Sequence, residues 1–67
     1  MTVELPEQTT PTVAPPGRPW MVDGFNRSGT RHFYATLPEA REARDGRIRT
    51  LGRPHGVYDA ATGRLKP

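Results

Sequence analysis

The chain has 67 residues, of which 33% are hydrophobic and 25% are charged, and its formal net charge is +3. This length allows one small domain with a thin core and little room for a deep catalytic pocket. The absence of cysteine excludes disulfides and thiolate metal sites, and the start MTVELPEQTT has neither the apolar run of a signal peptide nor that of a membrane span, so we expect a cytoplasmic protein without a membrane anchor.

Residues 1–18 are rich in proline and carry a net charge of −1, from two glutamates and one arginine. Proline lacks a donor N–H and cannot join the hydrogen-bond ladder of a helix or sheet. We therefore predict a disordered or polyproline-like N-terminal tail. The remaining residues, 19–67, hold nine basic and five acidic side chains, a net charge of +4, and we expect them to form the folded domain.

The first predicted elements are two strands joined by a short turn. Trp20–Phe25 is rich in aromatic and β-branched residues, and Asn26–Gly29 has the composition of a hairpin turn. The stretch TRHFYAT, residues 30–36, follows as the second strand. The pattern predicts an antiparallel hairpin over residues 20–35.

Alternation along these strands assigns side chains to two faces of the sheet. Trp20 and Val22 point to one face, which we expect to be the core. In the second strand we expect Phe33 and Ala35 to join the core. The side chains expected on the exposed face, away from the helix, are Phe25, His32 and Tyr34.

A helix is predicted to follow the hairpin. Thr36 and Glu39 match a capping box, and Pro38 fits the first turn, where its missing N–H costs little. Gly46 offers one possible end, but the apolar stripe favours a longer helix that continues to Leu51 with Gly52 as its cap. The longer helix places Arg44 in the middle of that stripe, where a guanidinium must be paired or extend toward solvent.

A third strand is predicted around Val57 and Tyr58, and the stretch DAATG after it is typical of a turn. The fold class is therefore α+β: a small antiparallel sheet, made of a β-hairpin plus a third strand, packed on one helix in the order ββαβ. The expected core consists of Trp20, Val22, Phe33, Ala35, Leu37, Ala40, Ile48, Leu51 and Val57.

Part of this pattern resembles a known family. A tryptophan strand, a glycine-containing turn flanked by Arg27 and Arg31, and the stretch FYATLPEA opening a helix are similar to the arm-type DNA-binding domain of phage tyrosine integrases. That resemblance covers about 25 residues and implies a sheet that enters a DNA groove, although the family places three strands before its helix. The whole body also resembles small uncharacterised ββαβ proteins of bacteria and phages.

No catalytic or cofactor signature accompanies these elements. His32 and His55 are the only imidazoles, they fall on different elements, and a zinc site needs three or four protein ligands. Neither a phosphate-binding loop nor a dinucleotide fingerprint is present. We therefore expect a protein that is not an enzyme and that has no metal site and no cofactor.

The arginines suggest what the domain binds. A positive surface with interleaved aromatic side chains suits a phosphate backbone and, in single strands, stacked bases. We therefore predict a small basic module that binds DNA or another nucleic acid. The candidate binding residues are Arg27, Arg31, His32, Tyr34, Arg41, Arg44, Arg47 and Arg49.

A second hypothesis is a protein-interaction module of phage or actinobacterial origin. Such a module would dock on a larger protein through its sheet edge or an apolar sheet face. Either module would be a monomer or a weak homodimer. The two hypotheses differ in salt dependence, because only binding to a phosphate backbone releases many counterions.

Overall fold

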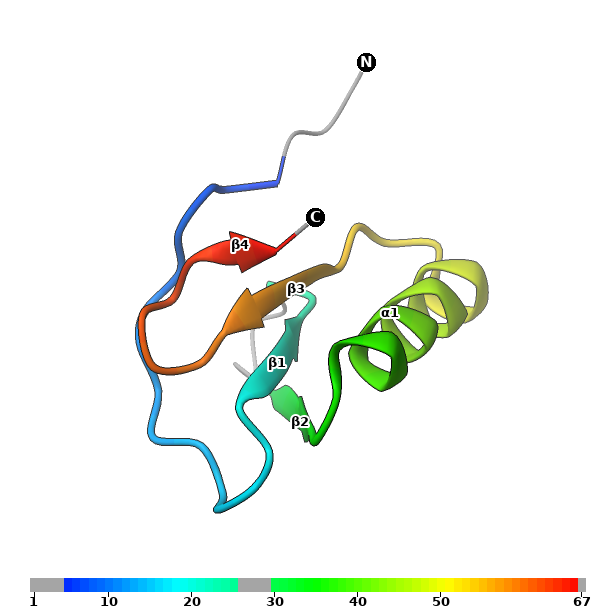
Figure 1. The fold of residues 1–67 in the computed structure, drawn as a ribbon. Coiled ribbons are helices and arrows are strands. Elements are labelled where there is room, and N and C mark those ends of the chain that lie inside the picture. The colour runs from blue at the N-terminus through cyan, green and yellow to red at the C-terminus, as the bar shows by residue number, and fades with distance from the viewer. Residues whose placement is uncertain (1–4, 26–29, 67) are drawn as a thin grey trace.

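The computed structural model describes residues 5–25 and 30–66. Its elements are β1 (Trp20–Asp23), β2 (Arg31–Tyr34), α1 (Leu37–Leu51), β3 (Gly56–Asp59) and β4 (Leu65–Lys66). The strands form one antiparallel sheet in the order β2-β1-β3-β4, and α1 lies beside it (Figure 1). The predicted α+β class and the order ββαβ are confirmed, and β4 extends the sheet by a fourth strand.

The predicted hairpin is present as the pair β1 and β2. Trp20 lies opposite Tyr34, and Val22 lies opposite His32. Phe25, just after β1, has a positive φ of 55°, and its N–H donates to Asp23 Oδ1 at 2.8 Å. The predicted turn residues 26–29 lie outside the described residues.

The helix has the longer of the two predicted extents. Thr36 has an extended backbone, and its hydroxyl accepts from the Glu39 N–H at 3.3 Å, as the capping box predicts. At the other end Gly52 takes the left-handed conformation with φ 66°, and its N–H donates to Ile48 O at 2.9 Å. The helix passes through Gly46 without a break.

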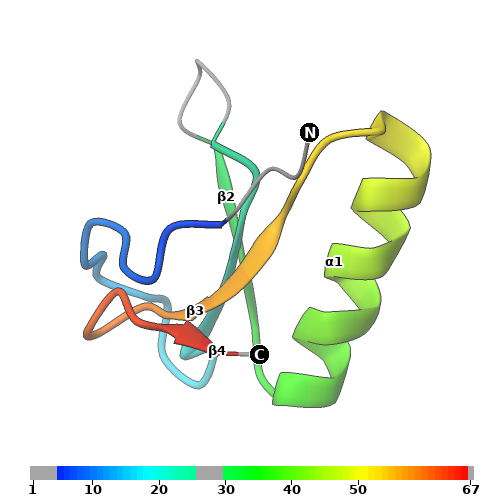
Figure 2. The same ribbon diagram turned by 90° about the horizontal axis from the view of Figure 1, so that it is seen from above.

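Both faces of the sheet are covered. α1 lies on one face and the N-terminal segment runs along the other (Figure 2). On the helix side Val22, Ala40 and Val57 form a buried cluster with Trp20, Tyr34 and Leu37 packed against it. On the opposite side Met21, Tyr58 and Ala60 form a second cluster with Ala14, Phe33 and Leu65 packed against it.

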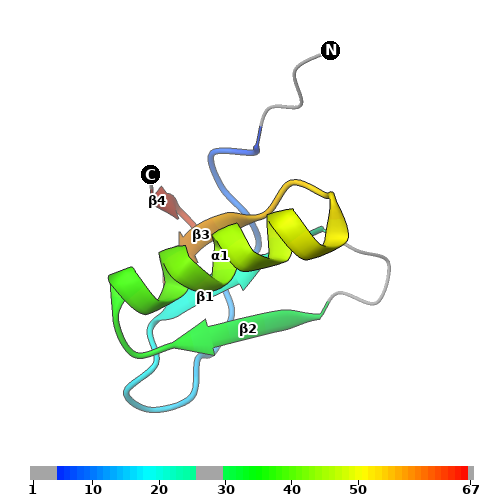
Figure 3. The same ribbon diagram turned by 90° about the vertical axis from the view of Figure 1, so that its right-hand side faces the viewer.

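Several predicted core positions are wrong. Phe33 is partly buried, but it packs on the face opposite the helix, and Ala35 is exposed. Ile48 and Leu51 are 39% and 54% exposed. Ile48 and Leu51 are exposed because α1 is longer than the strands. A four-residue strand spans about 13 Å, whereas a 15-residue helix spans about 22 Å, so the C-terminal end of α1 extends beyond the sheet. Figure 3 shows α1 lying across the sheet.

The described part of the N-terminal tail, residues 5–18, contains no helix or strand, as its prolines predict. It nevertheless makes specific contacts with the sheet. Residues 5–12, which we call the strap, run along β4 and the turn before it, and Gln8 forms an antiparallel bridge with Arg64. The predicted domain boundary at residue 18 and the disorder of the tail both stay predictions.

Candidate nucleic-acid interface

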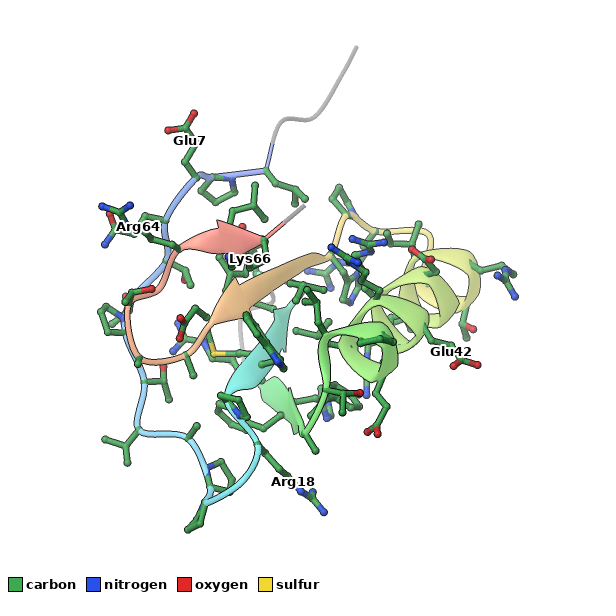
Figure 4. The ribbon with its side chains drawn as sticks, in the orientation of Figure 1. Glu7, Arg18, Glu42, Arg64 and Lys66 are labelled. Atoms are coloured by element: carbon green, nitrogen blue, oxygen red, sulfur yellow. The ribbon has the colours of Figure 1, made fainter. Side chains whose placement is uncertain are left out.

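Charge is divided along α1. The first half carries Glu39, Arg41 and Glu42, a net charge of −1, and Glu42 points away from the sheet (Figure 4). The second half and the loop after it carry Asp45 and four arginines, a net charge of +3; the arginines are Arg44, Arg47, Arg49 and Arg53. This arrangement complements the helix dipole, because acids lie near the positive end and bases near the negative end. The division therefore has a structural benefit, and it also collects positive charge at one end of the molecule.

Arg47 and His55 both act on His32. His32 projects from β2 toward the helix, and burial, the charge of Arg47 and the charge of His55 together lower its pKa. His55 is buried, its Nδ1 lies 2.8 Å from Arg53 O, and its ring rests on Gly24. The lowered pKa favours the neutral form of His32, so we look to the arginines for the positive charge of this surface.

The remaining helix arginines differ in exposure. Arg44 is half-buried, and its Nε donates to Asp45 Oδ1 at 3.0 Å. The guanidinium in the apolar stripe of the helix is therefore paired with a carboxylate. Arg41 and Arg49 are exposed. Arg53 is also exposed, and its Nη2 lies 3.5 Å from Gly24 O. The exposed guanidiniums can reach a ligand without leaving a buried site.

A shallow hollow separates β2 from the second half of α1. Its volume is about 390 Å³, and its lining consists of Tyr34, Ala43, Gly46, Arg47, Thr50 and Leu51. Gly46 contributes space, because apart from its chain neighbours and the helix's own backbone no atom lies within 4 Å of the place where a Cβ would be. Tyr34 lines the hollow but is partly buried against the core cluster, so its ring is not freely available for stacking on a base.

Arg31 does not join this group. It projects to the face opposite the helix, where its Nε donates to Asp23 Oδ2 at 3.2 Å and its Nη1 donates to Thr12 Oγ1. The prediction that His32 and Tyr34 share an exposed face away from the helix is wrong, because both side chains lie on the helix side. Arg27, the other predicted hairpin residue, lies outside the described residues. The structure thus separates Arg31 from His32, Tyr34 and the helix arginines.

Sequence reasoning missed two features. Arg53 was not among the predicted binding residues, although its place just after a helix C-terminus is typical of a dipole-complementing base. The buried group around Asp23 was also missed, because its partners are distant in sequence. Within residues 5–25 and 30–66, no group of three or more His, Asp or Glu side chains is arranged to hold a metal ion.

The comparisons with known proteins add no relative. No family model, no curated protein and no solved structure matches this chain. In the described part of the chain, no helix is long and apolar enough to cross a membrane. Any proposal of a function therefore rests on the geometry and charge of this chain alone.

Proposed function

We propose that this protein is a small non-enzymatic module that binds nucleic acid, with DNA as the leading ligand. The observation that carries the proposal is the collection of arginines on the second half of α1 and the following loop, from Arg44 to Arg53. A guanidinium donates paired hydrogen bonds that match the oxygens of a phosphate. Arg47, Arg49 and Arg53 are the side chains that we expect to contact the backbone.

The arrangement favours contact with phosphates over insertion of the helix into a groove. Glu42 and Asp45 share the exposed side of α1 with Arg49 and would approach the bases if the helix lay in the major groove. Approach through the C-terminal end of α1 keeps the glutamate away from the ligand. Because phosphate contacts carry no direct sequence information, we expect weak sequence preference and strong salt dependence.

The sheet is a poorer candidate surface than the resemblance to integrase arm domains implies. In that family the sheet enters the groove, but here α1 covers one sheet face and the N-terminal segment covers the other. Arg31 is also held by Asp23 and Thr12. The proposal therefore assigns the ligand to α1 and the loop after it.

Fluorescence anisotropy with short labelled duplex and single-stranded DNA tests this proposal. We expect binding at 50 mM salt that weakens about 20-fold for single strands and about 40-fold for duplex at 200 mM, because about three neutralised phosphates produce such a fall. The variant R47A/R49A should bind much more weakly. The matched control R18A/R64A removes the same charge from sites away from α1 and should bind nearly as the wild type does (Figure 4). Equal losses in both variants would contradict the proposed site.

Docking on a protein partner is the second candidate, and one observation favours it. The strap covers the β4 edge of the sheet, whereas the outer edge of β2 has no strand beside it among the described residues. An open strand edge can accept an extended segment from another protein. Capture of a partner without salt-sensitive DNA binding would favour this candidate.

A further inference from the structure

The strap is held by main-chain hydrogen bonds of the kind that join strands. The Leu65 N–H donates to Glu7 O at 2.9 Å, and the Thr9 N–H donates to Gly63 O at 2.7 Å. Further along, the Thr12 N–H donates to Ala60 O at 2.8 Å. Because a strand edge recognises any extended chain in this way, these bonds give affinity without requiring that the strap belong to the same molecule.

Side chains of the sheet then recognise particular strap residues. The Tyr58 hydroxyl donates to Pro6 O at 2.8 Å. The Thr9 hydroxyl donates to Asp23 Oδ2 at 3.3 Å, and Arg31 donates to the Thr12 hydroxyl. Tyr58 and Asp23 are buried and Arg31 is partly buried, so these side chains would lose hydrogen-bond partners if the strap left the site.

Gly63 shows how closely the strap fits. A Cβ at this position would lie 2.1 Å from Thr9 O, and the backbone has a positive φ of 74°. Both the space and the conformation therefore require glycine. The turn before β4 is shaped to receive an extended chain at Thr9.

The link between the strap and β1 is held at two points, because Ala14 packs against the cluster of Met21, Tyr58 and Ala60 and Pro19 O accepts from the Ala60 N–H, but the turn between them is exposed. Val13 is 96% exposed, and residues 15–18 form an exposed turn closed by the bond from Arg18 N–H to Pro15 O at 3.1 Å. Three prolines stiffen this link. If the turn opens, residues 13–19 can span about 20 Å in an extended polyproline conformation, close to the 21 Å and 23 Å shorter dimensions of the molecule. The opened strap can then reach beyond its own body.

From these contacts we infer that the strap site accepts residues 5–12 of a second copy, so that two molecules exchange straps and form a dimer. Exchange keeps the contacts of residues 5–12, and it requires the turn at residues 15–18 to open and Ala14 to leave the cluster of Met21, Tyr58 and Ala60. This inference does not depend on nucleic-acid binding.

The chain's lack of cysteine gives a direct test. Gln8 and Arg64 face each other as a non-hydrogen-bonded pair, flanked by the bonds of Leu65 N–H and Thr9 N–H, and such pairs bring side chains close enough for a disulfide. The single variants Q8C and R64C, one of them labelled with ¹⁵N, are mixed in equal amounts at about millimolar concentration in a glutathione buffer. Mass spectrometry then measures the disulfide-linked products.

Strap exchange predicts that the Q8C–R64C heterodimer clearly exceeds the half share that random pairing gives. The control mixture of V13C with R64C has an equally exposed thiol that is not opposite residue 64, and it should give the random share. A random share from Q8C with R64C as well would overturn the inference. Both substituted side chains are exposed, so failure to fold is not expected to obscure the result.

Discussion

Replacement of Asp23 by asparagine tests how much the hydrogen bonds of this buried carboxylate stabilise the fold. The Asp23 side chain is 5% exposed and accepts from Arg31 Nε at 3.2 Å, from the Phe25 N–H at 2.8 Å and from the Thr9 hydroxyl at 3.3 Å. Asparagine keeps one carbonyl oxygen, which can still accept from Phe25. It loses the negative charge, and its amide group must meet the donors of Arg31 or Thr9.

The expected loss follows from these contacts. A hydrogen bond to a charged group contributes about 1.5–3 kcal/mol. The Arg31 side chain is 24% exposed, so water partly replaces the lost partner, and we expect D23N to lower the free energy of unfolding by about 2 kcal/mol. That loss is large, because a chain of 67 residues has a total of about 3–10 kcal/mol.

Urea denaturation followed by fluorescence of Trp20, the only tryptophan, measures the change. With a slope of about 1 kcal/mol per molar urea, the midpoint should fall by roughly 2 M. D45N is the matched control, because Asp45 is 56% exposed in its pair with Arg44 and should contribute about 0.5 kcal/mol or less. Equal midpoints for D23N and D45N would refute the assignment of Asp23 as a structural anchor.

Three further outcomes are expected from the same unfolding assay. G46A should stabilise α1 by about 0.5–1 kcal/mol, because alanine favours a helix and the added methyl group meets no other side chain. G52A should destabilise the protein, because Gly52 has a φ of 66° that alanine adopts only with strain. Stabilisation by both variants would contradict the role of Gly52 as the C-cap. Burial and the charge of Asp23 raise the pKa of Tyr58 to about 12, so the tyrosine ionises at lower pH in the unfolded state than in the folded state. The free energy of unfolding should therefore fall between pH 10 and 12. Y58F should flatten that fall, and it should cost about 1 kcal/mol at pH 7 because the hydrogen bond to Pro6 O is lost. Because the pKa of His32 is lowered in the folded state, the unfolded state binds the proton at higher pH. The free energy of unfolding should therefore fall as pH drops below about 6.5. If H32N shows the same dependence of stability on pH, another group causes it.

Local signals in the sequence were sufficient to predict the helix. Thr36, Pro38 and Glu39 define its start, and Gly52 ends it in the left-handed conformation that glycine adopts easily. The alternation of β1 was also predicted, with Val22 toward the helix and Met21 on the other face. These features depend on neighbours in the chain, so a single sequence contains the information.

Which side chains of β2 point toward the helix could not be predicted from neighbouring residues alone. The register pairs Trp20 with Tyr34, which places Tyr34 on the helix side and Phe33 on the opposite side. A shift of one residue in register exchanges the two faces, and the register depends on the conformation of the connection between the strands. The assignment of Phe33 to the helix side failed for this reason, and the assignment of His32 and Tyr34 to the exposed face failed with it.

The strap was missed because hydrophobic pattern does not reveal main-chain pairing. Its residues are polar or proline, and Thr9 and Thr12 are joined to Gly63, Asp23 and Arg31 by contacts far apart in the sequence. Composition correctly predicts that such a segment forms no helix. It does not predict that the other face of the sheet needs a cover, which follows only from the apolar side chains of Met21 and Tyr58 there.

Mapping of the DNA-binding surface by NMR tests the central claim most directly. A short duplex is titrated into ¹⁵N-labelled protein at low salt, and the amide shift of each residue is followed. The account predicts that the largest changes fall on residues 44–53 and fade as salt is added. Changes centred on the strap or on β3 and β4, or no change at low salt, would contradict the assignment of the second half of α1 as a phosphate-binding surface.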